Sequence, residues 1–198
     1  MRLKIVQIGE AVLRQAARPL SPEEIRSESI RLLIEFMRET MQDAPGVGLA
    51  APQVGMSIQL AAIEDREEYH RNLSPAQLKE RERRPVPFHV IINPTLTLLN
   101  EDDKAEFFEG CLSMEGYTAV VPRARRVQVE CFDHNGKGQT INASGWYARI
   151  LQHEIDHLHG AIYTDRMYPR TLITAENLQR HWKDKPMSEI RKALETTK

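Results

Sequence analysis

The sequence has only two cysteines among its 198 residues, and it has no long apolar run. Two cysteines are too few for the disulfide framework of a secreted domain, so we expect a protein of a reducing compartment. No stretch approaches the roughly 20 apolar residues of a membrane-spanning helix, and we expect no membrane partner. The first residues also lack the apolar core of a signal peptide.

Neither sign of charge dominates the chain. Lys and Arg number 27, Asp and Glu number 28, and the formal net charge is −1. A charge this small produces no global field that would draw the protein to nucleic acid or to a membrane surface. The length is that of a single domain with a substantial core, and the sequence contains no internal repeat.

The pattern His-Glu-x-x-His stands at residues 153–157. On a helix, this spacing places His153 and His157 one turn apart on one face, where two imidazoles can bind one divalent cation. Glu154, between them, then reaches water bound to that cation. The alternative is a helix of the protein core in which the five-residue pattern occurs by chance. The flanking residues distinguish between the two interpretations.

Helix signals stand on both sides of this pattern. Ser144 is a candidate N-cap and Gly160 a candidate C′ residue, which together predict a helix over residues 145–159. At about 100° per residue, Glu154 falls on the apolar arc beside Ile150. A second arc is polar and comprises Arg149, Gln152, Asp156 and His159. Because an unused carboxylate on an apolar arc is costly to bury, the placement of Glu154 favours a metal site.

Two imidazoles are too few for a stable site, and the two cysteines differ as candidates for a third ligand. Cys131 alternates with two valines along a predicted strand that ends at the Asn135-Gly136 turn, so we expect a core residue. Cys111 lies in a turn-like context, Glu109-Gly110-Cys111-Leu112-Ser113. An inert buried thiol is the alternative for Cys111. Two histidines and one thiolate leave a coordination position open, which is typical of catalytic sites.

A glycine-rich segment, Gly46 to Gln53, faintly resembles a dinucleotide fingerprint. That fingerprint follows a strand and opens a helix, whereas this segment follows a predicted helix and contains Pro52. We therefore reject nucleotide binding and expect a close approach of backbone to a ligand. Gln53 offers an amide donor at the end of this segment.

The remaining pattern predicts an α+β fold. A capping box at Ser21 begins an amphipathic helix that runs to about Gln42. The Asn135-Gly136 hairpin signal indicates antiparallel strands, and the helices lie at both ends of the chain. We expect strands at 58–63, 90–94 and 96–99, a charged surface excursion at 64–87, an extended segment at Ile162-Tyr163, and helices at 172–182 and 188–194.

Three linked stretches together resemble the peptide deformylase family. The family motifs Gly-x-Gly-Leu-Ala-Ala-x-Gln, Glu-Gly-Cys-x-Ser and Gln-His-Glu-x-Asp-His-Leu stand here at residues 46–53, 109–113 and 152–158. The resemblance runs from about Leu3 to Tyr168. It implies antiparallel sheets packed around a central metal-binding helix, with a catalytic domain at residues 1–168 and a C-terminal helical tail at 169–198.

The resemblance also implies a function and a set of roles. The expected reaction is hydrolytic removal of the formyl group from nascent N-formylmethionyl chains, with release of formate. One divalent metal is implied, ferrous iron in the cell, with zinc, nickel or cobalt able to replace it. The implied metal ligands are Cys111, His153 and His157, the general acid/base is Glu154, and the oxyanion donors are Gln53 and the Leu112 N–H. The expected substrate contacts are Val47, Gly48, Gly110, Trp146 and Ile150.

Two segments depart from the commonest bacterial pattern. Residues 145–150 resemble the mitochondrial-type form, and Met114-Glu115-Gly116-Tyr117 replaces a more usual turn containing Ile-Pro. Both changes bear on side-chain preference rather than on the chemistry. Since no transit peptide precedes Leu3, we expect a protein of the bacterial cytoplasm.

Two other functions use the same helix. A metalloprotease would cut internal peptide bonds, but a cysteine as third ligand disfavours this. A non-enzymatic, metal-stabilised module would need a fourth protein ligand, and the family pattern supplies none.

The tail differs in charge from the rest of the chain. Residues 166–198 carry eight basic and four acidic side chains. A solvated appendage is one interpretation of such a terminus. The other is a docking element for ribosomal RNA, which the resemblance to deformylases with a C-terminal ribosome-binding helix supports.

Overall fold

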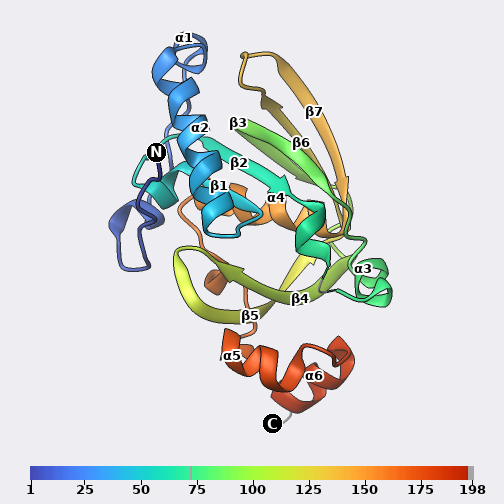
Figure 1. Cartoon of the computed structure of the whole chain (residues 1–198). Coiled ribbons are helices and arrows are strands. Elements are labelled where there is room, and N and C mark those ends of the chain that lie inside the picture. The colour runs from blue at the N-terminus through green and yellow to red at the C-terminus, as the bar shows by residue number, and fades with distance from the viewer. Residues whose placement is uncertain (72, 196–198) are drawn as a thin grey trace.

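The computed structural model describes residues 1–71 and 73–195, and within them the strands form two antiparallel sheets (Figure 1). The larger sheet has the order β1 (Gly48–Ala50), β2 (Leu60–Asp65), β3 (Val86–Leu98), β6 (Arg126–Phe132), β7 (Gly138–Ser144). The smaller sheet has the order β4 (Lys104–Cys111), β5 (Met114–Ala124), β8 (Ile173–Thr174). One helix, α4 (Gly145–Leu158), lies between the two sheets. The predicted α+β class with antiparallel sheets is confirmed.

Helix α4 begins and ends close to the predicted bounds. Ser144 has the extended backbone of an N-cap, but its side chain makes no capping hydrogen bond. Gly160 has φ +74, the left-handed conformation with which a glycine ends a helix. A Cβ at Gly160 would also lie 2.8 Å from the backbone carbon of Arg14, in the turn η1 (Ala11–Arg14). The N-terminal segment therefore packs directly against this helix end.

Both faces of α4 are buried. Its apolar side chains, Ile150 among them, join the core of the five-stranded sheet. Three of the four residues of the predicted polar stripe are buried too, since Arg149, Gln152 and Asp156 are at most 5% exposed, whereas His159, at the C-cap, is exposed. Gln152, for example, accepts from the Ala124 N–H at 3.0 Å and donates to the Ala124 carbonyl at 2.9 Å. The stripe therefore serves hydrogen bonding inside the protein.

The single helix predicted over residues 22–42 is wrong in one respect, because two helices form. The capping box at Ser21 is confirmed and begins the short helix α1 (Pro22–Ile25). Ser27 then accepts a second capping hydrogen bond and begins α2 (Glu28–Asp43). This second N-cap interrupts the run. The apolar side chains of α2 pack on β2 and β3, on the face of the larger sheet away from α4 (Figure 1).

The segments predicted at 90–94 and 96–99 form one strand, β3, rather than two. Pro94 lies within this strand because the register with β6 shifts between Ile92 and Thr95, where Asn93 has φ +49. A bulge of this kind accommodates a proline that donates no hydrogen bond. The strand predicted at 58–63 forms two residues later, as β2.

The charged excursion between β2 and β3 is confirmed as a loop with a turn, η3 (Glu67–His70), and a helix, α3 (Pro75–Glu80). The end of this excursion packs against Gly145, the first residue of α4. Gly145 has φ +59, and a Cβ there would lie 2.4 Å from the Cβ of Glu82 and 2.7 Å from the Arg81 carbonyl. The excursion is therefore fixed to the N-terminus of the central helix.

The C-terminal segment differs in part from the prediction. The extended segment predicted at Ile162-Tyr163 is correct for Ile162 but wrong for Tyr163, because Asp165 accepts from the Ile162 N–H and a 3₁₀ turn begins at Tyr163. The helix predicted at 172–182 is preceded by β8, since Ile173 and Thr174 pair with β5. The helix predicted at 188–194 is confirmed. The segment comprises η4 (Tyr163–Asp165), η5 (Pro169–Thr171), β8, α5 (Ala175–Asn177), the π-helical turn η6 (Leu178–Trp182) and α6 (Met187–Glu195).

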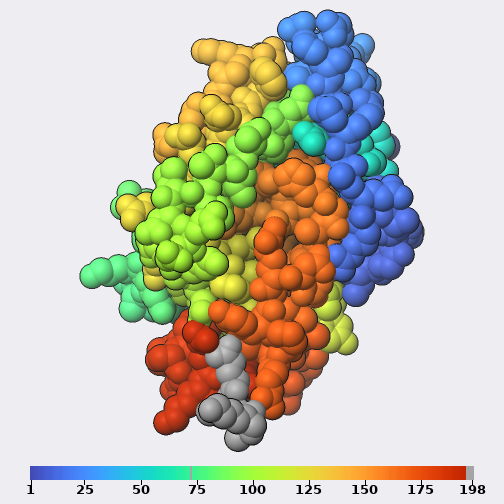
Figure 2. All heavy atoms as spheres, turned by 180° about the vertical axis from the view of Figure 1, so that it is seen from behind, coloured from blue at the N-terminus to red at the C-terminus, as the bar shows by residue number. Residues whose placement is uncertain are grey.

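Residues 171–174 are tied to the smaller sheet. Thr171 is fully buried, and its hydroxyl accepts from the Val120 N–H at 2.9 Å. Figure 2 shows the C-terminal helices at one end of the molecule, reached by the segment that follows α4. The domain boundary at residue 168 stays a prediction. Across residues 1–71 and 73–195, no helix is long and apolar enough to cross a membrane.

Candidate metal centre and active-site cleft

Cys111, His153 and His157 converge on one point, and we refer to them as the ligand cluster. One donor atom from each lies within 4.8 Å of the others. Cys111 Sγ lies 3.2 Å from His157 Nε2, and the two imidazole rings are 5.0 Å apart. The histidines are one turn apart on α4, whereas Cys111 ends β4 at the tight turn into β5. The strand turn thus brings a thiol to two imidazoles, as the motifs predicted.

The donor set fits a divalent cation. His153 Nδ1 is bonded to Glu109 Oε2 at 3.0 Å, which leaves its Nε2 for the cluster. His157 is fully buried, and its Nδ1 has no hydrogen-bond partner among the described residues. A thiolate with two imidazoles suits zinc, iron, cobalt and nickel rather than magnesium or calcium.

The two imidazoles have pKa values shifted in opposite directions. Burial, with the charge of His153 beside it, lowers the pKa of His157 well below its usual range. Burial acts in the same direction on His153, but its hydrogen bonds to Cys111 and Glu109 outweigh burial, so its pKa lies well above the usual range. Since metal ligands must be deprotonated, cation binding here would release protons.

Glu154 lies beside the ligand cluster and is 3% exposed. Burial raises the pKa of Glu154 to about 7, and its Oε2 has no hydrogen-bond partner in the described part of the chain. Gly48 makes room for this carboxylate, because a Cβ at Gly48 would lie 2.1 Å from Glu154 Oε1. The glycine-rich segment therefore approaches Glu154 closely, and its predicted approach to a ligand stays a prediction. A carboxyl with a pKa near 7 suits proton transfer at neutral pH.

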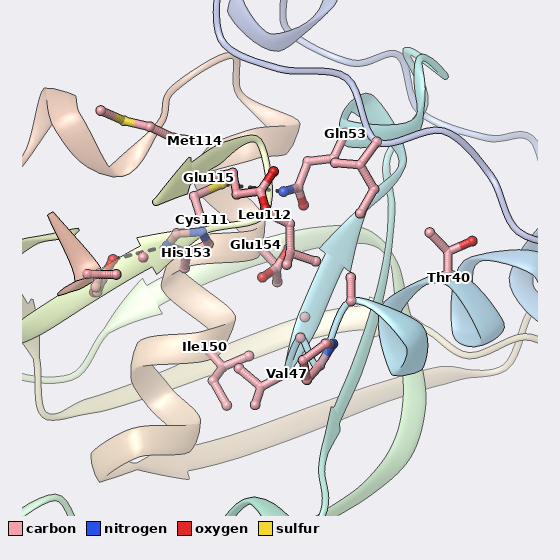
Figure 3. Close-up of a pocket in the computed structure, with 18 of the residues that line it drawn as sticks. Thr40, Val47, Gln53, Cys111, Leu112, Met114, Glu115, Ile150, His153 and Glu154 are labelled. Atoms are coloured by element: carbon pink, nitrogen blue, oxygen red, sulfur yellow. Dashed lines mark hydrogen bonds and ion pairs between the residues drawn. The ribbon is translucent and has the colours of Figure 1, made fainter. Parts of the chain in front are cut away.

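The two predicted oxyanion donors border the same point. Gln53, on η2 (Ala51–Val54), accepts from the Ala50 N–H through its Oε1 at 2.8 Å. Its Nε2 is consequently directed toward Cys111 Sγ, 3.4 Å away (Figure 3). Leu112 follows Cys111 directly, and its carbonyl accepts from the Gln7 side chain at 2.9 Å. The oxyanion roles of Gln53 and Leu112 stay predictions.

A cleft of about 890 Å³ opens onto the ligand cluster. Figure 3 shows Ile150 and Val47 on one side of it, below Glu154, and Gln53 with Leu112 above. The cleft lining includes all the residues that the sequence predicted as substrate contacts: Val47, Gly48, Gly110, Trp146 and Ile150.

The Trp146 side chain in this lining packs against one aromatic ring and two guanidinium groups. Phe107 contacts its ring edge-to-face at 6.0 Å. The guanidinium groups of Arg81 and Arg83, from the excursion, each lie 5.1 Å from the Trp146 ring. The excursion between β2 and β3 therefore supports one wall of the cleft.

Behind His153 lies a chain of ion pairs that the sequence did not predict, buried at Glu109, Arg123 and Asp156 and ending at the half-exposed Arg166. Glu109 pairs with Arg123 at 2.9 Å, Arg123 pairs with Asp156, and Asp156 pairs with Arg166 at 2.6 Å. Although burial opposes ionisation, the charge of Arg123 and the hydrogen bond from His153 hold the pKa of Glu109 well below its usual range. Glu109 is therefore a carboxylate, the group that orients ligating histidines in many metal sites.

The sequence contains an indication of the role of Glu109 but none for the two arginines that bind it. Glu109 stands two residues before Cys111, and a ligating histidine ordinarily donates its second N–H to a carboxylate or carbonyl. Arg123 and Arg149 carried no comparable signal, because their partners lie on other elements. The prediction for Cys131 is confirmed, since it is 6% exposed within the core of the larger sheet.

Comparison with known proteins gives consistent matches. A family model described as polypeptide deformylase matches residues 2–172. Peptide deformylase 1A, chloroplastic, of Solanum lycopersicum is 48% identical over 174 residues, 88% of this chain and 62% of that protein. Peptide deformylase 1 of Bifidobacterium longum is 43% identical over 185 residues, 93% of this chain and 82% of that protein. The crystal structure of a Synechococcus elongatus peptide deformylase in complex with actinonin has a TM-score of 0.69 and 38% identity, covering 84% of this chain and 79% of that one.

The residues matched by the family model, 2–172, contain strands β1 to β7, α4, the ligand cluster, Glu154 and the glycine-rich segment. The chain spans 62% of the length of the Solanum lycopersicum protein and 82% of the Bifidobacterium longum protein. Extent and identity together place the sequence among these proteins. This chain belongs to the polypeptide deformylase family.

Proposed function

We propose that this protein is a metal-dependent hydrolase that removes the formyl group from N-terminal formylmethionine of nascent polypeptides. The reaction adds water across the formamide bond and yields formate and a free α-amine. The observation that carries the proposal is the convergence of the ligand cluster, buried Glu154 and the Gln53 amide on one cleft.

Cys111, His153 and His157 would hold the cation. A divalent metal in this position supplies Lewis acidity and makes water nucleophilic near neutral pH. Ferrous iron is the proposed metal in the cell, with zinc, nickel or cobalt as replacements. The sulfur ligand supports this choice of soft or borderline metals over magnesium or calcium.

Glu154 transfers the proton. Its carboxylate accepts a proton from the attacking water and then gives it to the departing amine nitrogen. The pKa of about 7 suits both steps, because the group is neither fully ionised nor fully protonated at neutral pH. Burial at 3% exposure also limits proton exchange with bulk water.

Gln53 and Leu112 stabilise the charge that develops on the formyl oxygen. The Gln53 amide is already oriented by the Ala50 N–H, so it needs little reorganisation when the oxyanion forms. The Gln7 contact with the Leu112 carbonyl holds the adjoining turn in place. Donors preorganised in this way act on the transition state more than on the substrate.

The methionine side chain occupies the apolar part of the cleft, between Val47, Trp146 and Ile150. An unbranched, polarisable thioether suits such a slot. Gly48 and Gly110 offer backbone groups to the formylmethionine, and neither carries a side chain that would narrow the cleft.

The test is an assay of two activities on one preparation. The iron-, nickel- or cobalt-loaded protein should release formate from a formyl-Met peptide and leave casein intact. Casein cleavage without formate release would favour a metalloprotease. Absence of both activities in a metal-loaded protein would favour the metal-stabilised module.

Nascent formylmethionyl chains are the proposed partners, and a ribosome contact through the basic tail remains part of the proposal. At least four of the basic side chains pair with carboxylates of the protein: Arg166 with Asp156, Arg180 with Glu176, Lys185 with Glu189, and Arg191 with Glu106. Lys198 lies outside the described residues. The bacterial cytoplasm stays a prediction, since the relatives include proteins named as chloroplastic and as mitochondrial.

A further inference from the structure

Arg149 is a buried cation in the lining of the cleft, and the proposed chemistry makes no use of it. It is 3% exposed. Its Nη1 donates to Glu109 Oε1 at 2.6 Å and to the Val121 carbonyl at 2.9 Å, and its Nη2 donates to the Ala105 carbonyl at 2.6 Å. One guanidinium thus joins α4 to β4 and β5.

Arg149 and His153 act on opposite oxygens of one carboxylate. Glu109 Oε1 accepts a hydrogen bond from Arg149 Nη1, and Glu109 Oε2 is hydrogen-bonded to His153 Nδ1 at 3.0 Å. Arg123 donates to both oxygens, at 3.0 and 2.9 Å. A carboxylate bound from both sides cannot rotate without breaking charge-assisted hydrogen bonds, so its orientation toward His153 is determined by the two arginines.

Arg149 also contacts the aromatic wall of the cleft. Its guanidinium lies 5.3 Å from the Phe107 ring and 5.7 Å from the Trp146 ring. Burial lowers the pKa of Arg149 to about 10, so the side chain stays charged at neutral pH. The same group therefore borders the slot proposed for methionine and the carboxylate behind the proposed metal ligand.

We infer that Arg149 is a positioning residue that acts through Glu109 on His153 and links the cleft wall to the metal centre. The inference rests on the proposed function, since it assigns a role within the same site. Arg149 fixes one oxygen of Glu109, Glu109 fixes the His153 ring with Nε2 toward the ligand cluster, and the ring orientation sets how firmly the cation is held. A partner behind a ligating histidine typically changes metal affinity or activity by about 10- to 100-fold.

A purely structural role for Arg149 makes a different prediction. The residue also binds two backbone carbonyls, and loss of those bonds alone would lower stability without a specific effect on His153. Arg166 provides the matched control. Its side chain is half exposed and donates to Asp156, in the same ion-pair chain, but among the described residues it makes no hydrogen bond to Glu109 and does not line the cleft.

The experiment compares Arg149→Met, Arg149→Lys and Arg166→Met as cobalt-loaded proteins. Cobalt absorption reports the coordination of the metal, and transfer of cobalt to a chelator gives its release rate. We expect Arg149→Met to release cobalt about 10- to 100-fold faster than wild type, with an altered spectrum. Lysine keeps the charge but lacks the planar fork, so Arg149→Lys should lie between wild type and Arg149→Met. Arg166→Met should resemble wild type.

A double-mutant cycle separates positioning from structure. Glu109→Gln alone should also accelerate cobalt release, and adding Arg149→Met to it should change the rate little, because both act through one contact. On a formyl-Met peptide, Arg149→Met should lower kcat with KM nearly unchanged. If the Arg149→Met protein does not fold, the same double-mutant cycle can be measured with Arg149→Lys and Glu109→Gln.

Three results would overturn the inference. They are equal cobalt release from Arg149→Met and Arg166→Met, additive effects in the cycle, and a change confined to KM. The proposed function has its own test: it would be wrong if metal-loaded wild-type protein released no formate. Even then, the cobalt-release rates would still test the effect of the contact between Arg149 and Glu109.

Discussion

Gly48 and Glu154 lie so close together that a methyl group on Gly48 would come within 2.1 Å of Glu154 Oε1. The glycine is thus required by a side chain from another element, and its own backbone needs no left-handed conformation. Glu154 enters the cleft only because β1 has no side chain at that position. If Glu154 transfers the proton as proposed, this contact makes the glycine-rich segment part of the proton-transfer machinery.

Gly48→Ala should displace the Glu154 carboxylate and lower kcat for a formyl-Met peptide by about 10²-fold or more, the scale of general acid–base catalysis. Bound metal should remain near one equivalent, because the ligand cluster is untouched. Gly138→Ala, on the exposed strand β7 where a Cβ meets no atom within 4 Å, is the control. Near-normal turnover of the Gly48→Ala protein would contradict the steric argument.

The Glu154→Ala protein should still bind the metal, because the three ligands are unchanged. Its kcat for a formyl-Met peptide should fall by at least about 10²-fold, because the group that transfers the proton is missing. Metal content is measured on the folded protein before kinetics. Normal turnover with metal bound would show that another group transfers the proton.

The two cysteines should respond differently to replacement by serine. Cys111→Ser should lower metal content or reactivity, because an un-ionised hydroxyl replaces a thiolate poorly. Cys131→Ser places a hydroxyl in the core of the larger sheet and should cost about 1 kcal/mol of stability with metal content unchanged. Elemental analysis beside thermal unfolding distinguishes them, and equal metal loss in both variants would refute the assignment.

Trp146→Ala should weaken the preference for a methionine side chain. The wild-type protein should favour formyl-Met over formyl-Asp peptides strongly in kcat/KM, because an apolar slot cannot pair a buried carboxylate. Without the indole, the packing of Arg81, Arg83 and Phe107 around the cleft wall is lost. An unchanged ratio in a folded Trp146→Ala protein would place the methionine pocket elsewhere.

Removal of the tail should weaken ribosome binding if the tail docks on ribosomal RNA. A cut after Tyr168 would delete Thr171, which is buried against β5, so the cut is better placed after Thr174. Co-sedimentation with ribosomes should fall and turnover of a free formyl-Met peptide should survive. Binding of the intact protein should weaken steeply with salt, as phosphate contacts do. Equal binding by both forms at every salt concentration would leave the tail as an appendage.

Local sequence was sufficient for the central helix and for Cys131. The bounds of α4 follow from Ser144 and Gly160, and the facing of His153 and His157 follows from a four-residue spacing. Cys131 is buried because strand alternation places it with its neighbouring valines. These features depend on residues close in the chain, whose relative geometry is set by the helix or strand itself.

Other features of the chain were missed because competing local signals looked alike. Ser27 caps α2 within what the apolar spacing predicted as one helix. Pro94 suggested a break, but a register shift absorbed it within β3. Ile173 and Thr174 pair with β5, and no neighbouring residue signals a partner so far away in sequence.

The sequence by itself determined the helix, the spacing of its two imidazoles and the turn that carries Cys111. Only the tertiary structure decided that this turn meets the helix, that Gly48 leaves room for Glu154, and that Arg149 points inward to Glu109. The reason is physical: hydrogen-bond periodicity acts over a few residues, whereas burial of a charge requires a partner that packing brings from a distant strand. The polar stripe of α4 could be read from the chain, but its partners on β4 and β5 could not.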